Sequence, residues 1–269
     1  VALIRYKSGA DSVYCTGTII NSYWLVTSRH CFQTGTEIGT VFINALSTKD
    51  KTAKTVRFSE VVVHGDFIEE EGVNDIALVK TEIPMDSVSP KVKFAYLMTK
   101  DWPVDVRYNR TCQTVHYMQL NGSSQVNLYR DDVLAEVGPS ACRCKFFGYA
   151  KQPPLSKFQG EGICANSNTH MAACYAHTAA PLFCDSELVG IGHLVVDCEA
   201  TEITYQDNVK ICQNGRKNLN TFTGLFHHTQ WMKSKGIEFP NRQAKAKAAN
   251  IYPMLYLLIG SVILCSKMN

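Results

Sequence analysis

Three short segments of the chain carry side chains that together could perform nucleophilic catalysis. His30 lies directly before a cysteine, Asp75 precedes the hydrophobic run IALV, and Thr178 lies in the stretch CYAHTAAPLFC from Cys174 to Cys184. A hydroxyl is a poor nucleophile at neutral pH, so it must lose its proton to a base such as imidazole as it attacks. A buried carboxylate must hold that imidazole in one tautomer. The sequence offers one residue of each type.

The segments around these residues resemble those of the trypsin/chymotrypsin family of serine proteases. The block YCTGTIINSYWLVTSRHC is similar to the family pattern CGGSLIxxxWVVTAAHC, NDIALVK is similar to NDIALLK, and CYAHTAAPLFC is similar to CxGDSGGPLxC. The resemblance covers most of residues 9–236. It implies that His30 is the general base, that Asp75 orients it, and that Thr178 stands at the position of the nucleophile.

The nucleophile loop departs from the family pattern at the residues that would do the chemistry. Thr178 replaces the serine, His177 replaces the aspartate that receives the new N-terminal ammonium on activation, and Ala176 replaces a glycine. The amides of Ala176 and Thr178 stand at the oxyanion-hole positions, and loss of one such donor costs about 10²–10³ in rate. The extra methyl group of Thr178 restricts its χ1 angle. Ala179 and Ala180 replace two more glycines, whose backbone freedom the loop uses.

The positions that the resemblance assigns to the substrate pocket also differ from the family pattern. Ala172 stands six residues before Thr178, where trypsin-like enzymes carry an aspartate that binds lysine or arginine. The segment ELVGIGHLVV is similar to the cleft-wall strand LVGIxSWG, so that His193, Leu194 and Val195 replace Ser-Trp-Gly. The resemblance therefore implies an uncharged pocket, narrowed by Val195 in an elastase-like manner.

The chain has 11 cysteines in 269 residues and no CxxC pair, which favours disulfides in an oxidising compartment over zinc sites. The family resemblance implies three disulfides and suggests two more. They are Cys15–Cys31, Cys112–Cys184, Cys174–Cys198, a bridge from Cys164 to Cys142 or Cys144, and one between the remaining member of that pair and Cys212. Cys265 is then left over near the end of the chain.

The length suits one large domain or two small ones, and all-β barrels of this size often form one unit. The resemblance implies that residues 1–240 form two packed six-stranded antiparallel Greek-key barrels with a C-terminal helix. Residues 241–269 are predicted to be a polar spacer and a hydrophobic tail. The apolar run 251–265 lacks helical polarity and is short for a spanning helix, which needs roughly 17–25 residues.

This tail suits a GPI-attachment signal, whereas Lys267 after the apolar run favours a transmembrane anchor, and a buried structural segment is the third possibility. Either anchor would place the domain outside the cell, secreted or at the cell surface. Two glycosylation sequons, at Asn109 and Asn121, agree with secretion. The net charge of +3 is too small to indicate a nucleic-acid partner.

We expect a protease homologue that does not cut peptides and serves as an extracellular binding or regulatory module. Its ligand would be a peptide or protein, such as a protease, an inhibitor or a substrate-like segment, and its tail would contact a membrane. The alternative is a weakly active serine-type endopeptidase that uses Thr178, His30 and Asp75. A metal ion bound by His30, His177 and Asp75 is disfavoured, because the family's residue at position 177 points away from the base. No cofactor and no metal are expected.

Overall fold

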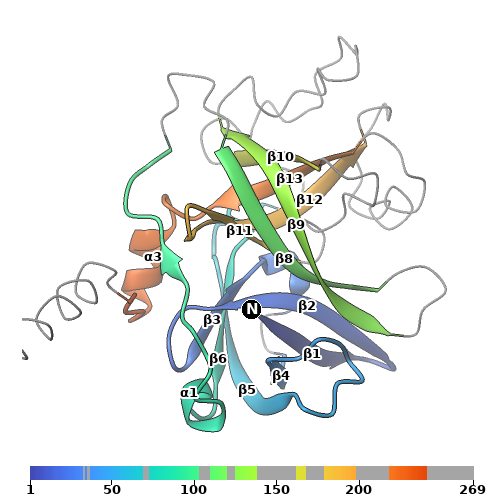
Figure 1. Cartoon of the computed structure of the whole chain (residues 1–269). Coiled ribbons are helices and arrows are strands. Elements are labelled where there is room, and N and C mark those ends of the chain that lie inside the picture. Colours follow the sequence, from blue (N-terminus) through green and yellow to red (C-terminus); the bar gives the residue numbers. More distant parts are fainter. Residues whose placement is uncertain are drawn as a thin grey trace, which may run out of the picture.

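The structure is a computed structural model that describes residues 1–32, 34, 37–68, 73–102, 110–119, 125–137, 162–167, 179–197 and 218–240. For residues 166–167, 194–197 and 218–219, the backbone alone is described. The strands form two groups that lie one above the other, with the N-terminal group at the bottom of Figure 1.

The N-terminal strands close into a six-stranded antiparallel barrel in the order β1-β2-β3-β6-β5-β4, with β1 also paired to β4. Its strands are β1 (Ala2–Ser8), β2 (Asp11–Ile19), β3 (Trp24–Thr27), β4 (Gly39–Ile43), β5 (Lys54–Val63) and β6 (Ala77–Thr81). In β5, Val56 and Phe58 are buried between exposed neighbours, which is the period-two pattern of a strand with one face on a core. Strand β3 pairs with β6 and not with β4, which is the next strand in the chain. The connection from β3 to β4 therefore crosses over, as in a Greek key.

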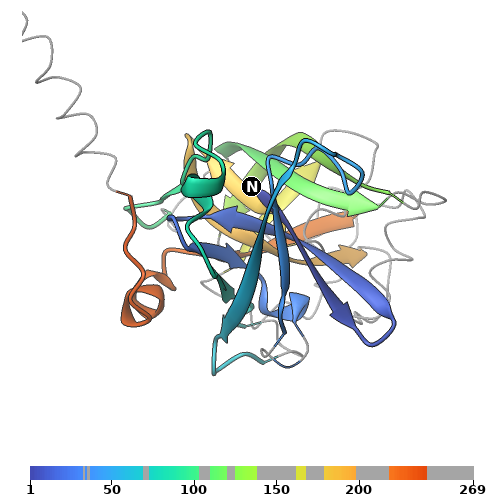
Figure 2. The same ribbon diagram turned by 90° about the horizontal axis from the view of Figure 1, so that it is seen from below.

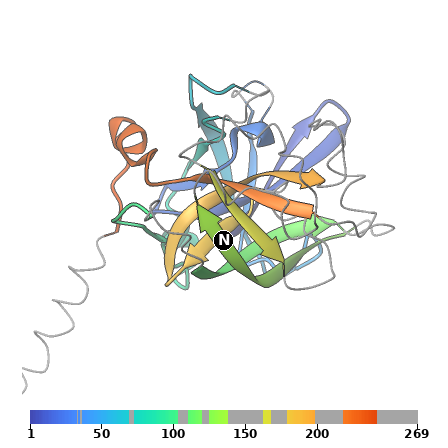
Figure 3. The same cartoon turned by 90° about the horizontal axis from the view of Figure 1, so that it is seen from above.

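The second barrel is a ring of six antiparallel strands in which β11 pairs with both β8 and β12. Figure 3 shows these strands from above, in green to orange. Its strands are β8 (Arg110–Gln119), β9 (Val126–Val137), β10 (Gly162–Ser167), β11 (Pro181–Cys184), β12 (Glu187–Asp197) and β13 (Asn218–Gly224). A seventh strand, β7 (Tyr96–Leu97), adds to β12 in parallel. The prediction of two six-stranded antiparallel barrels is thus confirmed.

Hydrogen bonds and a small apolar cluster join the two barrels. Tyr117 of β8 donates its backbone N–H to the Thr16 hydroxyl at 3.0 Å and its own hydroxyl to the Ala45 carbonyl at 2.7 Å. Leu3, Tyr117 and Val126 are buried together at this junction. On the same junction the Ser28 hydroxyl donates to the Gly192 carbonyl at 2.5 Å, so the segment that carries His30 is held against β12.

In the part of the chain that the structure describes, two short α-helices flank the barrels. Helix α1 (Met85–Val88) follows β6, and helix α3 (Thr229–Ser234) follows β13. Figure 2, seen from below, shows α3 at the side of the molecule. Met232 of α3 and Ile237 after it are buried in the core cluster of the first barrel, so the C-terminal segment closes the second barrel and then packs on the first. The expected C-terminal helix is confirmed.

Two of the implied disulfides are present among the described residues. Cys15–Cys31 ties β2 to the 3₁₀ turn Arg29–Cys31, and Cys112–Cys184 ties β8 to β11. Cys164 is also disulfide-bonded, to a cysteine outside the described residues. The remaining bridges, the sequons and the tail fall on residues that the structure does not describe. In the described part of the chain, no helix is both long and apolar enough to cross a membrane.

Candidate active site

His30 lies on a single 3₁₀ turn that its neighbours hold in place. The following residue, Cys31, is disulfide-bonded, and its carbonyl accepts a hydrogen bond from the Tyr6 hydroxyl at 2.5 Å. Ser28, just before the turn, is anchored on β12. The His30 side chain is left 12 % exposed, so its ring faces Asp75 on one side and keeps some access to solvent.

Asp75 lies on the loop that enters β6, and its side chain is completely buried. The residue before it, Asn74, has the left-handed φ of 59° that asparagine tolerates. The amide group of Asn74 donates to the Asp66 carbonyl at 2.9 Å, and its oxygen contacts Nε2 of His228 at 3.1 Å. The Thr223 hydroxyl of β13 donates to the Asp75 carbonyl at 3.4 Å, so elements of both barrels position this carboxylate.

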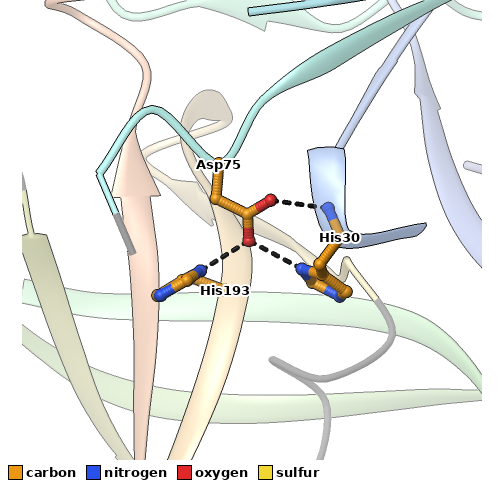
Figure 4. Close-up of side chains that lie close together, drawn as sticks. All are labelled: His30, Asp75 and His193. Carbon is orange, nitrogen blue, oxygen red and sulfur yellow. Dashed lines mark hydrogen bonds and ion pairs between the residues drawn. The ribbon is translucent and has the colours of Figure 1, made fainter. Parts of the chain in front are cut away.

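The two residues meet in the geometry that a base and its orienting carboxylate require, as Figure 4 shows. One oxygen of Asp75, Oδ1, accepts the backbone N–H of His30 at 2.8 Å. The other, Oδ2, lies 2.6 Å from Nδ1 of the same ring. The carboxylate therefore holds both the backbone and the ring of His30, and it favours the tautomer that leaves Nε2 to accept a proton.

A second histidine shares the same carboxylate oxygen. Nδ1 of His193, on β12, lies 2.5 Å from Oδ2 of Asp75, and the His193 side chain is completely buried. The pairing of β12 with β13 shifts register between Gly192 and Val195, which is the position of a β-bulge. Bulges re-aim side chains, and here the His193 ring points at Asp75 (Figure 4). The rings of His193 and His30 lie 6.4 Å apart at an interplanar angle of 62°.

The pKa shifts in this cluster arise because two imidazoles share one buried carboxylate. Burial acts to raise the pKa of Asp75, but the two imidazoles outweigh it and hold that pKa well below its ordinary value of 3.8. Burial lowers the pKa of His193 from its ordinary value of 6.5, against the opposing effect of Asp75. At neutral pH the cluster therefore contains an ionised carboxylate beside a neutral His193.

The structure brings together three of the predicted site residues: His30, Asp75 and His193. Thr178, His177, Ala176 and Ala172 lie outside the described residues. Of Val195 the backbone is described, opposite Asn220 in the sheet. The roles predicted for these positions in the nucleophile loop and the pocket stay predictions.

Sequence reasoning assigned His193 to the wall of the cleft and missed its contact with Asp75. The signal was present in the sequence, because His193 replaces the serine of the pattern LVGIxSWG. What the pattern did not convey is the direction of the side chain. The bulge in β12 decides that direction, and it depends on pairing with β13.

The chain that follows the nucleophile position is described from Ala179 onward. Ala179 is buried and has φ = 57°, a left-handed conformation that costs an alanine roughly 1–2 kcal/mol relative to the right-handed one. The carbonyl of the next residue, Ala180, accepts the backbone N–H of Gly192 at 2.7 Å. The backbone therefore keeps a glycine-like turn although alanine occupies it.

Comparisons with known proteins agree with this architecture. The family model described as Trypsin matches residues 1–212. U21-ctenitoxin-Pn1a of Phoneutria nigriventer is 35% identical over 77 residues, which cover 27% of this chain and 31% of that protein. Urokinase-type plasminogen activator of Gallus gallus is 23% identical over 198 residues, which cover 66% of this chain and 43% of that protein. The chain thus spans less than half the length of these curated relatives.

Among solved structures, neuropsin, a serine protease expressed in the limbic system of mouse brain, superposes with a TM-score of 0.62 at 16% identity. The match covers 87% of this chain and 94% of that one, and at this identity it shows the fold. Three observations point to the same family: the two barrels, the His30–Asp75 pair and a family model that matches most of the chain. The chain therefore belongs to the trypsin family of serine proteases.

Proposed function

We propose that this chain is a catalytically inactive trypsin-like protease homologue that acts as an extracellular binding or regulatory module. One observation carries the proposal. The His30–Asp75 pair keeps distances of 2.6 and 2.8 Å, whereas the loop that should present the nucleophile has threonine, histidine and alanine at the positions of Ser, Asp and Gly. The residues that are kept, His30 and Asp75, also stabilise the fold. The residues that are replaced are those that would take part in the reaction.

The substitutions at positions 176–178 act against catalysis for separate reasons. Thr178 adds a methyl group on the carbon that bears the hydroxyl, and this branching restricts the angle at which the hydroxyl can face His30. His177 is not an acidic counter-charge for an activating ammonium group. Ala176 places a Cβ where the family's glycine brings a backbone donor close to the oxyanion, a contribution of about 10²–10³ in rate.

The proposed ligand is a peptide or protein that lies in the former substrate cleft. In the family, the backbone of the strand that corresponds to β12 pairs with the substrate. Here β12 pairs with both β11 and β13, with one shift of register in each pairing. Ala172 and Val195 would make the pocket beside it uncharged and narrow.

The proposed location is outside the cell. Disulfides in both barrels fit an oxidising compartment. In this proposal residues 1–240 are the binding domain, Asn109 and Asn121 carry glycans, and residues 241–269 provide a GPI signal or a membrane anchor.

A second candidate is a weakly active serine-type endopeptidase that uses Thr178 with His30 and Asp75. The short contact between Nδ1 of His30 and Oδ2 of Asp75 favours it, because that pair is ready to accept a proton from a hydroxyl.

A fluorophosphonate probe separates the two candidates. We expect no labelling of the full chain, and labelling of the triple revertant Ala176→Gly, His177→Asp, Thr178→Ser. The matched control is the same revertant with His30→Ala, which should not react because it lacks the base. Labelling of the parent chain at Thr178 that His30→Ala abolishes would establish the weak enzyme instead.

A further inference from the structure

The buried cluster of two imidazoles and one carboxylate has the composition of a transition-metal site. His30, Asp75 and His193 each offer one ligand atom, and these atoms lie within 4.8 Å of one another. Zinc in catalytic sites is commonly bound by three such protein ligands with a fourth position left open. Two histidines and a carboxylate also hold other divalent first-row metals.

We propose that His30, Asp75 and His193 bind a divalent transition-metal ion of the zinc class. The set differs from the family's base and orienting carboxylate by one residue, His193, which supplies a nitrogen ligand where the pattern has a serine hydroxyl. Two imidazoles and a carboxylate bind such ions better than one imidazole, a carboxylate and a neutral hydroxyl do, because imidazole nitrogen suits these metals.

The groups around the cluster already orient the carboxylate as a metal ligand requires. Oδ1 of Asp75 accepts the backbone N–H of His30 at 2.8 Å, which leaves Oδ2 directed at the two rings. Hydrogen bonds of this kind fix the ligating oxygen and are a general feature of metal sites. The Thr223 hydroxyl and the Ser28–Gly192 contact hold the backbones of the loop and of β12.

Binding requires a small rearrangement of the rings. The present contacts of 2.6 and 2.5 Å between the nitrogens and Oδ2 are hydrogen-bond lengths. A tetrahedral ion about 2.0–2.1 Å from each ligand separates nitrogen and oxygen by roughly 3.3 Å, so each ring must move by about 0.7 Å. His30 is on the side with solvent access, so it provides the path for the ion, and water or a ligand atom completes the fourth position.

Proton positions change within the rings when the ion binds. Each neutral imidazole that now donates from Nδ1 gives up that hydrogen and carries one on Nε2, which conserves the number of protons. In this tautomer Nε2 of His30 is a donor and cannot accept a proton from a hydroxyl. Metal binding and use of His30 as a base therefore exclude each other, and the proposal holds whether or not Thr178 has residual activity.

Cobalt titration of the full chain tests the proposal. After removal of metal with EDTA and desalting, Co²⁺ is expected to produce visible absorption bands that saturate at one equivalent and that Zn²⁺ abolishes by displacement. His193→Ser restores the family hydroxyl beside Asp75 and removes one ligand. Loss of a group that merely orients a ligand costs 10–100-fold in affinity, so loss of the ligand itself should weaken binding by about 100-fold or more.

The matched control is His227→Ala, which removes a histidine whose side chain is 39 % exposed near Asp101 and should leave the titration unchanged. Thermal unfolding supplies a second readout. Zn²⁺ at 100 times its Kd should raise the parent's midpoint by roughly 5–10 °C and that of His193→Ser by no more than about 2 °C. If His193→Ser lacks a cooperative transition, His30→Ala, at the more exposed ligand, replaces it. Absence of cobalt bands in the parent overturns the proposal, as does a folded ligand variant with parental affinity.

Discussion

The two barrels contribute to the same site but differ in how closely they follow the family pattern. In the first barrel, the segments WLVTSRHC and NDIALVK keep the residues that hold His30 and Asp75. In the second barrel, the segment CQTVHYM resembles the family's CxxxGWG, so that His116, Tyr117 and Met118 stand where the family has Gly-Trp-Gly. Ser-Trp-Gly becomes His193-Leu194-Val195, and the nucleophile loop changes as well. Two of these replacements, His116 and His193, are buried imidazoles.

The His30–Asp75 pair has a structural role that is separate from any reaction. Asp75 accepts the backbone N–H of His30 as well as contacting its ring, and it is buried without exposure to solvent. A carboxylate in this position stabilises the fold even where no reaction occurs, because an unpartnered buried donor is costly.

The largest effect is expected from removal of the carboxylate in the first barrel. Asp75→Ala leaves two imidazoles and one backbone N–H without their acceptor, and loss of one partner of a buried charged cluster costs about 3–5 kcal/mol. Urea unfolding measures this change in the free energy of unfolding. Glu60→Ala is the control, because its 3.3 Å contact with Lys80 is exposed and should contribute less than about 1 kcal/mol. Equal costs for the two variants would refute a structural role for Asp75.

The second barrel should dominate the dependence of stability on pH below neutrality. Burial lowers the pKa of His116 from 6.5 to about 4. The unfolded chain therefore takes up a proton at this ring from about pH 6.5 downward, while the folded chain takes it up only near pH 4. Stability is full above this window and falls as pH drops through it, by up to about 3 kcal/mol.

Urea unfolding at a series of pH values between 8 and 4.5 checks this prediction. His116→Leu should make the curve less steep, and His193, whose pKa burial also lowers, accounts for the dependence that remains. The depressed pKa of Asp75 acts in a lower range, since its contribution is lost only below its ordinary value of 3.8. The contributions of Asp75 and His116 to stability can thus be distinguished by the pH range in which each is lost. A curve for His116→Leu as steep as that of the parent would contradict the assignment.

The smallest effect concerns the turn after the nucleophile position. Ala179→Gly should stabilise the fold by about 1 kcal/mol, because it relieves a left-handed alanine at φ = 57°. Ala180→Gly is the neighbouring control. This residue is buried and is not among the described residues with a positive φ, so the same change should destabilise by about 0.5–1 kcal/mol. Thermal unfolding of both variants measures whether each change raises or lowers stability. Destabilisation by Ala179→Gly would show that Ala179 is not strained.

The sequence by itself determined the features that depend on local pattern. Short motifs identified His30 and Asp75, and the family resemblance implied the Cys15–Cys31 and Cys112–Cys184 bridges, which the structure confirms. The family resemblance implied the two barrels as well, because each motif has a fixed place in the family fold.

Tertiary structure alone decided how segments from far apart in the chain meet. His193 reaches Asp75 across 118 positions, and the contact depends on a shift of register between β12 and β13. The short β7 strand adds to β12, and Met232 packs into the first barrel after the chain has completed the second. Side-chain direction at a bulge and packing between distant strands arise from pairing, which a linear pattern does not encode. The same physical reason explains why a serine-to-histidine replacement became visible as a second imidazole on Asp75 only in the folded chain.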